Sequence, residues 1–448
     1  MRKRGFMMIE QMKPSGIDWI GEIPTDWNIK RVKYLASLKG RIGWQGLTSD
    51  EYIDEGPFLI TGIDFCNGGI DWENCVHITE ERWAEAPEIH IHNGDLLITK
   101  DGTIGKVAIV DNLTTKASLN SGVLLIRPQV DYDKKFLFWV LQSDEFWTWF
   151  KLKNAGNSTI VHLYQGDFAE FSYTFPMAEE QKAIANYLDA QCSKLDSIIA
   201  DLEKQIDTLQ KYKKSLITET VTKGLDKSAP VKDSGIEWIG KIPEHWEVKK
   251  FSYECERIGD IDHYMPDSVD EGIPYVMTGD FIGEGNDIDF ENCKQISRQD
   301  YLRLSRKMKP MINDILFARY ATIGTVRIVD TDKEFLVSYS CAIIRVKKTL
   351  FSKYVFYYLK SGAFYEEISK YINTNTQGNV GIDSIGRAKI PLPPVSEQEL
   401  IADFLDEKCT QIDELLQIKQ SQLSSIKRHK KSLIYEYVTG KKRVTEVK

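Results

Sequence analysis

The feature that most limits the possible folds is a long amphipathic stretch that the chain carries twice. In residues 176–224, apolar side chains recur every seven positions, the spacing that lines one face of a helix packed against another helix. The first copy contributes Leu188, Leu195, Leu202, Leu209 and Leu216. The second copy, residues 393–440, contributes Leu405, Ile412, Leu416, Leu423 and Leu433. We therefore predict two long helices with matching apolar seams.

The rest of the chain also repeats. Residues 15–27, SGIDWIGEIPTDW, return as SGIEWIGKIPEHW at 234–246, 219 positions later. The segment GDLL, followed by TIG, at 94–105 returns at 313–324 as NDIL followed by TIG, with the same offset. Glu180-Gln181 matches Glu397-Gln398 with an offset of 217. The chain is thus two unequal copies of one unit.

Each unit is predicted to hold one mixed α+β globular domain followed by one long helix. The globular stretches contain short β-prone runs separated by Gly, Asn and Asp, with helical patches at 134–150 and 352–369. The predicted boundaries are 15–175 for the first domain, 176–224 for its helix, 225–233 for a linker, 234–392 for the second domain and 393–440 for its helix. Gly224 is a suitable C-cap for the first helix.

A single amphipathic helix cannot bury its own seam, but the second copy supplies a partner within the same chain. Because each domain precedes its helix, a pseudo-twofold arrangement would pair the helices antiparallel. We expect an intramolecular antiparallel coiled coil that acts as a spacer between the two domains.

Composition limits the class of protein. The chain has 448 residues, of which 42% are hydrophobic and 28% charged, and it has no apolar run near the roughly 20 residues that span a bilayer. Its seven cysteines include no CxxC pair, so we expect neither a disulfide framework nor a zinc knuckle, and a cytoplasmic location. The net charge of −8 opposes nucleic-acid binding unless basic residues gather on one face or partner subunits contact the phosphates.

Catalytic motifs are missing from the sequence. There is no phosphate-binding loop, because Gly102 and Gly105 have two residues between them where that motif has four. No GxSxG, HExxH or dinucleotide fingerprint occurs, and the prolines at 391–394 lack the polar and aromatic neighbours of an amine methyltransferase motif. His90 and His92 share one face of a predicted strand, but no third ligand is evident, so a polar strand face is favoured over a metal site.

Polar glycine-containing loops are the candidates for binding. The segment 39–46 combines cations, an indole and an amide with three glycines, which would let Arg and Gln side chains approach base edges. The predicted DNA-binding residues of the first domain are Arg41, Trp44, Gln45, Lys100, Thr103, Asn157 and Ser158. Those of the second domain are Arg319, Tyr320, Thr322, Asn375 and Gln377.

Basic clusters near the ends of both predicted helices have two interpretations. Lys211, Lys213 and Lys214 in the first helix, and Lys427, Arg428, Lys430 and Lys431 in the second, are either phosphate contacts or cations placed favourably near a helix C-terminus. The sequence does not decide between the two.

The order of SGIDWIGEIPTDW, KGRIGWQGLT and GDLLITKDGTIG, then Pro-x-x-x-Glu-Gln and a helix ending in KKSLI, all repeated in degenerate form, resembles the specificity subunit of type I restriction-modification enzymes. The resemblance covers about residues 15–440. It implies two target-recognition domains that read a split, asymmetric site in double-stranded DNA, with the helices fixing the gap between half-sites. The second loop, 256–264, departs from the first, as reading a different half-site would require.

The resemblance also implies that the chain is not catalytic and binds no cofactor itself. Two methylation subunits would bring S-adenosylmethionine for adenine-N6 methylation, and motor-nuclease subunits would bring ATP and Mg. The alternatives are a coiled-coil adaptor that binds proteins, and a self-contained methyltransferase or nuclease. Association that is insensitive to salt would favour the adaptor, and methyl transfer by the chain alone would favour the enzyme.

Overall fold

The computed structural model describes residues 11–41, 47–155, 161–283, 285–372 and 378–444. The chain forms two compact units, one made of residues 1–202 and 422–448, the other of residues 203–421. Each unit therefore contains one globular domain and a part of both long helices. We call the globular parts the first domain (β1 to β13) and the second domain (β14 to β24).

The first domain is a mixed α+β structure. Its strands are β1 (Met12–Pro14), β2 (Glu22–Pro24), β3 (Asn28–Arg31), β4 (Ala36–Gly40), β5 (Ile53–Ile60), β6 (Phe65–Cys66), β7 (Gly69–Ile70), β8 (Val76–His77), β9 (Leu96–Thr99), β10 (Val107–Ile109), β11 (Ala117–Leu119), β12 (Val123–Pro128) and β13 (Ser172–Phe175). Its helices are α1 (Glu80–Ala84), α2 (Lys134–Gln142), α3 (Asp144–Lys153) and α4 (Gln165–Ala169).

The second domain repeats this plan. Its strands are β14 (Val231–Asp233), β15 (Lys241–Pro243), β16 (Glu247–Lys250), β17 (Cys255–Gly259), β18 (Ile273–Val276), β19 (Lys294–Ile296), β20 (Ile315–Ala318), β21 (Val326–Ile328), β22 (Leu336–Val337), β23 (Cys341–Val346) and β24 (Lys389–Leu392). Its helices are α6 (Phe251–Glu254), α7 (Arg298–Leu304), α8 (Ser352–Lys360), α9 (Gly362–Ser369) and α10 (Ile382–Arg387).

The sheets have the same topology in both domains. The four-stranded sheet has the order β10-β9-β12-β4 in the first domain and β21-β20-β23-β17 in the second. The three-stranded sheet has the order β11-β5-β8 in one and β22-β18-β19 in the other, and its only parallel pair, β5 with β11, recurs as β18 with β22. This match confirms that the sequence repeat is a structural repeat.

The central strands are buried on both faces, which explains their continuous apolar runs. Leu96 and Ile98 of β9 pack into the core that includes α2 and α3, whereas Leu97 packs into the core beneath β5 and β11. In β20, likewise, Ile315 packs into one hydrophobic core and Leu316 packs into another. Each four-stranded sheet is thus a layer between helices and a smaller sheet.

Each helical patch predicted as one segment is a pair of helices. The first breaks at Ser143 and the second at Ser361, and both serines are buried and accept a hydrogen bond from the first turn of the following helix. Serine is a preferred N-cap because its hydroxyl satisfies an otherwise unpaired amide.

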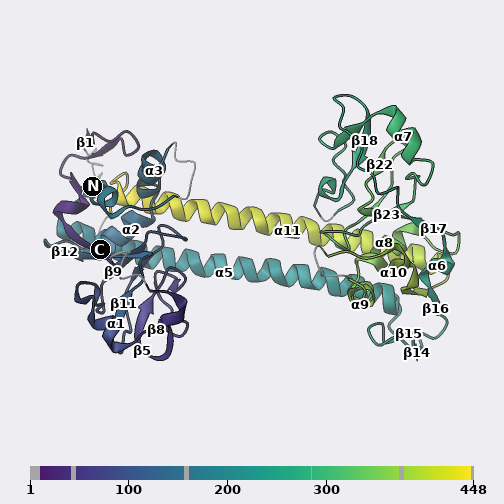
Figure 1. Ribbon diagram of the computed structural model, residues 1–448, viewed down its shortest axis with the longest axis horizontal. Coiled ribbons are helices and arrows are strands. Elements are labelled where there is room, and N and C mark those ends of the chain that lie inside the picture. The colour runs from purple at the N-terminus through teal and green to yellow at the C-terminus, as the bar shows by residue number, and fades with distance from the viewer. Residues whose placement is uncertain (1–10, 42–46, 156–160, 284, 373–377, 445–448) are drawn as a thin grey trace, which may run out of the picture. The chain divides into compact units, whose positions relative to one another are not determined.

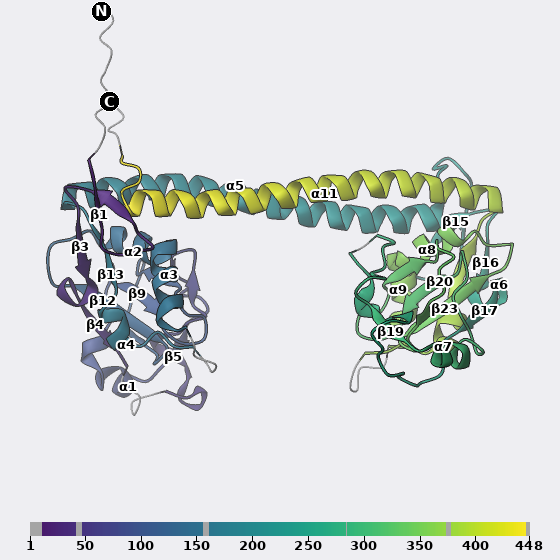
Figure 2. The same ribbon diagram turned by 90° about the horizontal axis from the view of Figure 1, so that it is seen from above.

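The two long helices are α5 (Ala178–Lys223) and α11 (Val395–Val438). Both are followed by a glycine with positive φ, 73° at Gly224 and 71° at Gly440, the conformation expected just past a helix end. Figure 1 and Figure 2 both show the teal α5 and the yellow α11 side by side.

The heptad seam joins the helices antiparallel. In the first unit the beginning of α5 packs against the end of α11, and Lys430 Nζ lies 2.5 Å from an Asp196 oxygen. In the second unit the end of α5 packs against the beginning of α11, and Lys213 Nζ lies 2.6 Å from Asp413. Of the predicted seam residues, Leu188, Leu202, Leu405, Ile412 and Leu433 are buried, and Leu195, Leu209, Leu216, Leu416 and Leu423 are half-buried. The predicted α+β class and packed helices are confirmed.

Candidate nucleic-acid interface

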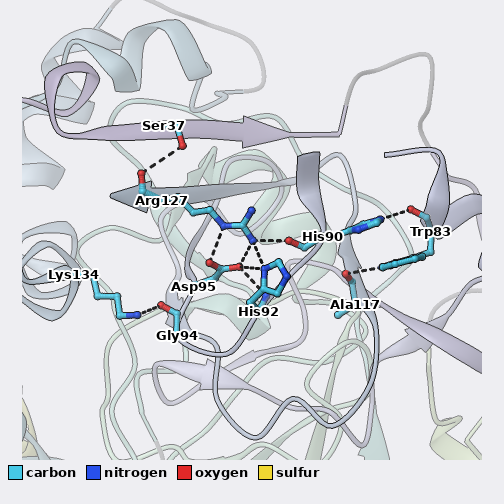
Figure 3. A network of polar contacts seen from close by, with 9 residues as sticks. All are labelled: Ser37, Trp83, His90, His92, Gly94, Asp95, Ala117, Arg127 and Lys134. Atoms are coloured by element: carbon cyan, nitrogen blue, oxygen red, sulfur yellow. Dashed lines mark hydrogen bonds and ion pairs between the residues drawn. The ribbon is translucent and has the colours of Figure 1, made fainter. Parts of the chain in front are cut away.

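The repeated motifs supply side-chain contacts that hold each unit together, and we call these shared contacts the skeleton. In the first domain the Arg127 guanidinium donates two hydrogen bonds to the Asp95 carboxylate, with Nε 3.0 Å from Oδ1 and Nη2 2.6 Å from Oδ2 (Figure 3). In the second domain Arg345 makes the same two hydrogen bonds to Asp314, with Nε 2.8 Å from Oδ1 and Nη2 2.6 Å from Oδ2. Such bidentate pairs hold a fixed geometry. The aspartate of the GDLL and NDIL motifs therefore fixes the fold and does not face a ligand.

The two histidines that share a predicted strand face belong to this framework. His90 Nε2 lies 2.9 Å from the Trp83 carbonyl, and its ring stacks on the Trp83 ring at 3.6 Å. His92 Nδ1 lies 2.8 Å from Arg127 Nη2. Among the described residues no group of three or more His, Cys, Asp or Glu is placed to hold a metal ion.

The Glu-Gln motif docks each helix on its domain. Gln181, fully buried, accepts a hydrogen bond from the Asp133 amide at 3.0 Å, just before α2. Gln398, also fully buried, accepts one from the Phe351 amide at 2.8 Å, just before α8. A buried amide whose hydrogen bonds are made defines one docking angle, because rotation would leave polar atoms unpaired.

The glutamate of the same motif binds the tryptophan near the start of each domain. Trp27 Nε1 donates to Glu180 at 2.9 Å, and Trp246 Nε1 donates to Glu397 at 3.0 Å. In the first unit Arg443, beyond the end of α11, also contacts Glu180 at 2.7 Å. The repeated SGI-W-IG-IP-W segment is thus a docking element, as its presence in both copies suggests.

Loops from distant parts of the sequence gather at one edge of the first domain. The turn between β9 and β10 lies against residues 61–63, because Thr103 Oγ1 donates to the Gly62 carbonyl at 3.2 Å. The Lys100 carbonyl accepts from the Leu163 amide at 3.0 Å. Lys100 is half-exposed and Thr103 exposed, so both predicted residues lie where a ligand can reach them.

Arg41 is placed differently from the prediction. It is 3% exposed, its Nε donates to the Leu119 carbonyl at 2.8 Å and its Nη2 donates to Ser118 Oγ at 2.9 Å. Burial lowers the pKa of Arg41. In this position the guanidinium joins two strands and does not reach outward, so we replace the predicted base contact by a structural role. Trp44, Gln45, Asn157 and Ser158 lie outside the described residues.

The corresponding edge of the second domain shares the backbone plan. Val380 N donates to the Arg319 carbonyl at 3.0 Å, and an isolated bridge joins Tyr320 to Asn379. Arg319 itself is 4% exposed and is bound to Asp260 at 2.7 Å, so it too is structural and the predicted base contact is withdrawn.

The other residues predicted in the second domain fall into two groups. Tyr320 is half-exposed and Thr322 is exposed in the turn between β20 and β21. Asn375 and Gln377 lie outside the described residues.

The two edges differ in chemistry. In the second domain the rings of His263 and Tyr339 stack at 4.8 Å, and Tyr320 meets Tyr339 edge to face at 6.3 Å. In the first domain, Asp101 stands in place of Tyr320, paired with His162. Sequence reasoning missed His162 and Asn379. Extending the 217-residue offset upstream from the Glu-Gln motif would have aligned them.

The basic clusters of the long helices do not lie at helix ends. Helix α5 continues to Lys223 and α11 to Val438, about two turns or more beyond the last lysine of each cluster. The helix dipole acts only within the last turn, so it does not explain the clusters. Lys213 and Lys430 pair with aspartates of the other long helix. Lys211, which pairs with Asp207 on its own helix, is exposed, as are Lys214, Lys427, Arg428 and Lys431.

Comparison with known proteins agrees with this architecture. The family model for the type I restriction modification DNA specificity domain matches residues 24–208 and 255–428. A protein provisionally named type I restriction enzyme MjaX specificity subunit, from Methanocaldococcus jannaschii, is 28% identical over 448 residues, with 95% of this chain and 96% of the relative covered. The type I restriction enzyme EcoBI specificity subunit of Escherichia coli is 23% identical, with 78% and 74% covered.

A solved structure gives the same answer for the fold. A chain from work on complex assembly and conformational transition of the type I R-M system superposes with a TM-score of 0.66 at 16% identity, covering 93% of this chain and 98% of its own. Separately, among the described residues, every helix is too short or too polar to cross a membrane.

Proposed function

The chain belongs to the family of type I restriction-modification DNA specificity proteins, and we propose that each of its two domains reads one half of a split, asymmetric site in double-stranded DNA. It is a specificity subunit, which supplies target recognition and not catalysis. One observation carries the finer proposal: the two domains share one skeleton but present different side chains at the same edge. Equivalent positions with different chemistry are what two different half-sites require.

We further propose that the chemistry comes from partner subunits of the complex. Two methylation subunits would bind S-adenosylmethionine and methylate adenine at N6, and motor-nuclease subunits would bind ATP and Mg. The internal repeat supports two copies of one partner, because a pseudo-twofold chain offers the same surface twice. The complex would act in the cytoplasm on cellular DNA.

The decisive experiment is binding of the full chain with its methylation subunits to a duplex that carries the split site. The site is first found by mapping methylated adenines in the host genome with and without this protein. Scrambling either half-site should weaken binding by about 10²-fold or more. Unchanged affinity after one half-site is randomised would show that the two-domain reading is wrong.

The exposed helix cations provide a second prediction, because the dipole interpretation no longer applies to them. We propose that Lys214 and Lys431, which occupy equivalent positions in the two units, contact DNA phosphates. The double variant Lys214→Gln, Lys431→Gln should lower the slope of log affinity against log salt by about 2, since each phosphate contact contributes about 0.9.

The double variant should lose the same amount of affinity for cognate and for scrambled DNA, because phosphates carry no sequence information. Lys194→Gln, an exposed lysine on α5 outside both clusters, is the matched control. An unchanged slope, or a loss confined to one sequence, would assign these cations to another role.

A further inference from the structure

A pair of side chains that no single sequence motif contains lies at the exposed edge of the first domain. Asp101 sits in the turn between β9 and β10, and His162 lies 61 residues further along the chain. His162 Nδ1 is 2.5 Å from Asp101 Oδ1, and both side chains are 37% exposed. The pair is therefore neither part of the core nor fully solvated.

The backbone holds the two residues together. The Leu163 amide, next to His162, donates to the carbonyl of Lys100, next to Asp101, at 3.0 Å. The Lys100 amide in turn donates to the Gly122 carbonyl at 2.8 Å. The turn itself is closed by Gly102, whose φ of 68° suits glycine. The positions of the pair are thus set by the sheet and not by the hydrogen bond between the two side chains alone.

The second domain brings the equivalent positions together by the same backbone bond. Its Val380 amide donates to the Arg319 carbonyl at 3.0 Å, and Tyr320 and Asn379 form a bridge. The turn again contains a residue with positive φ, Ala321 at 54°. One juxtaposition therefore carries aspartate and histidine in one domain and tyrosine and asparagine in the other.

This pattern distinguishes residues that would recognise DNA bases from residues that hold the fold together. The skeleton pairs, such as Asp95 with Arg127 and Asp314 with Arg345, keep their chemistry in both copies. The juxtaposed pair keeps its position and changes its chemistry. A contact that differs between two otherwise equivalent domains, on an exposed edge, fits a part of the DNA that differs between the half-sites, which is the base sequence.

We propose, building on the proposed function, that Asp101 and His162 are specificity-determining residues for the first half-site, and that Tyr320 and Asn379 take the same place for the second. Asp101 is a positioning residue: its carboxylate accepts a hydrogen bond from Nδ1–H, and in that tautomer of the imidazole Nε2 is an acceptor. That acceptor matches an exocyclic amino group, which is presented by adenine N6 or cytosine N4 in the major groove.

The test uses the full chain in complex with its methylation subunits and a DNA library in which each half-site is randomised in turn. His162→Ala should reduce affinity for the cognate site by about tenfold and relax preference at one or two base pairs of the first half-site only. The salt slope should stay unchanged, because no phosphate contact is lost. His429→Ala, an exposed histidine on α11, is the control and should alter neither preference nor affinity.

Asp101→Asn separates positioning from contact. With an amide in place of the carboxylate the imidazole loses its fixed tautomer, so the first half-site preference should shift while the thermal stability stays near that of the parent. The double variant Asp101→Tyr, His162→Asn carries the side chains of the second domain and should change the first half-site preference without affecting the second.

Two outcomes separate this inference from the proposed function. If the parent complex shows no dependence on a split site, the proposed function itself fails. If the parent reads a split site but correctly folded His162 and Asp101 variants keep its base preferences, the assignment of this pair is wrong. Equal loss on cognate and scrambled DNA would also overturn it, because that pattern marks a backbone contact.

Discussion

Inserting one matched heptad into both long helices will lengthen the preferred gap between the half-sites by about three base pairs. The insertion sites are residues 201–212 of α5 and the equivalent residues 418–429 of α11. Seven helical residues add about 10 Å, and one base pair of B-form DNA occupies about 3.4 Å. Affinity for the original site should fall by about 10²-fold or more, and the protein should bind the lengthened site in preference to it.

A heptad is chosen because it preserves the phase of the apolar seam. Leu202 and Ile412 are buried at this interface, and a shorter insertion would rotate one side of the seam out of register. Measuring binding to a series of sites with gaps of different length gives the preferred gap. The matched control adds the same seven residues between 225 and 230, after α5 and before β14, and should leave the gap unchanged.

The bases read in each half should be the same in the parent and in the lengthened protein, because the insertion changes neither domain. An unchanged gap would show that the helices do not act as a spacer. A changed half-site sequence with the original gap would equally contradict the proposal.

Parts of the fold that rest on local periodicity could be predicted from the sequence. The helices followed from the heptad spacing, and the end of the first helix followed from Gly224, because helix periodicity and capping are local properties. The internal repeat required only comparison of the chain with itself. The parallel pairing of β5 with β11 was not predictable, since it joins strands far apart in the sequence.

The candidate site was predicted less well because burial is a long-range property. A glycine-rich loop with an arginine is typical of an exposed binding loop, yet Arg41 bonds Ser118 and the Leu119 carbonyl, which the fold brings to it. Conversely, Asp101 and His162 have no motif that links them, and only the backbone contact beside them places them together. Repeated motifs marked the skeleton, and the positions of greatest interest for reading DNA were the ones that differ between copies.

Ionisation of Glu145 is expected to make the stability of the first unit fall as pH rises. This glutamate in α3 is fully buried, and its Oε1 accepts a hydrogen bond from the Thr174 amide at 3.2 Å, whereas its Oε2 finds no hydrogen-bond partner among the residues that the structure describes. Burial raises the pKa of Glu145 to about 8, against an ordinary value of 4.5, and the Thr174 amide offsets only part of that rise.

The sign follows from linkage between protonation and folding. Below about pH 4.5 both folded and unfolded states hold the proton and Glu145 imposes no penalty. Between that value and about 8 the unfolded state releases the proton first, so the free energy of unfolding falls by up to about 1.4 kcal/mol for each pH unit. Above about 8 the full penalty remains and its contribution no longer changes.

Glu145→Gln should remove this slope, because glutamine does not ionise and its carbonyl can still accept from the Thr174 amide. At pH 8 the variant should exceed the parent in free energy of unfolding by on the order of 4 kcal/mol, while near pH 4.5 the two should agree. Denaturant unfolding at half-unit steps from pH 5 to 8, together with hydrogen exchange of β13, measures the effect and locates it.

The matched control is Glu179→Gln, an exposed glutamate in the first turn of α5, which should leave the slope of the parent intact. The second unit supplies an internal comparison, because α9 has Ala363 where α3 has Glu145. The hydrogen exchange of β24 should therefore not show the pH dependence that Glu145 causes in β13. If the variant and the parent lose stability equally between pH 5 and 8, the buried carboxyl is not the group responsible.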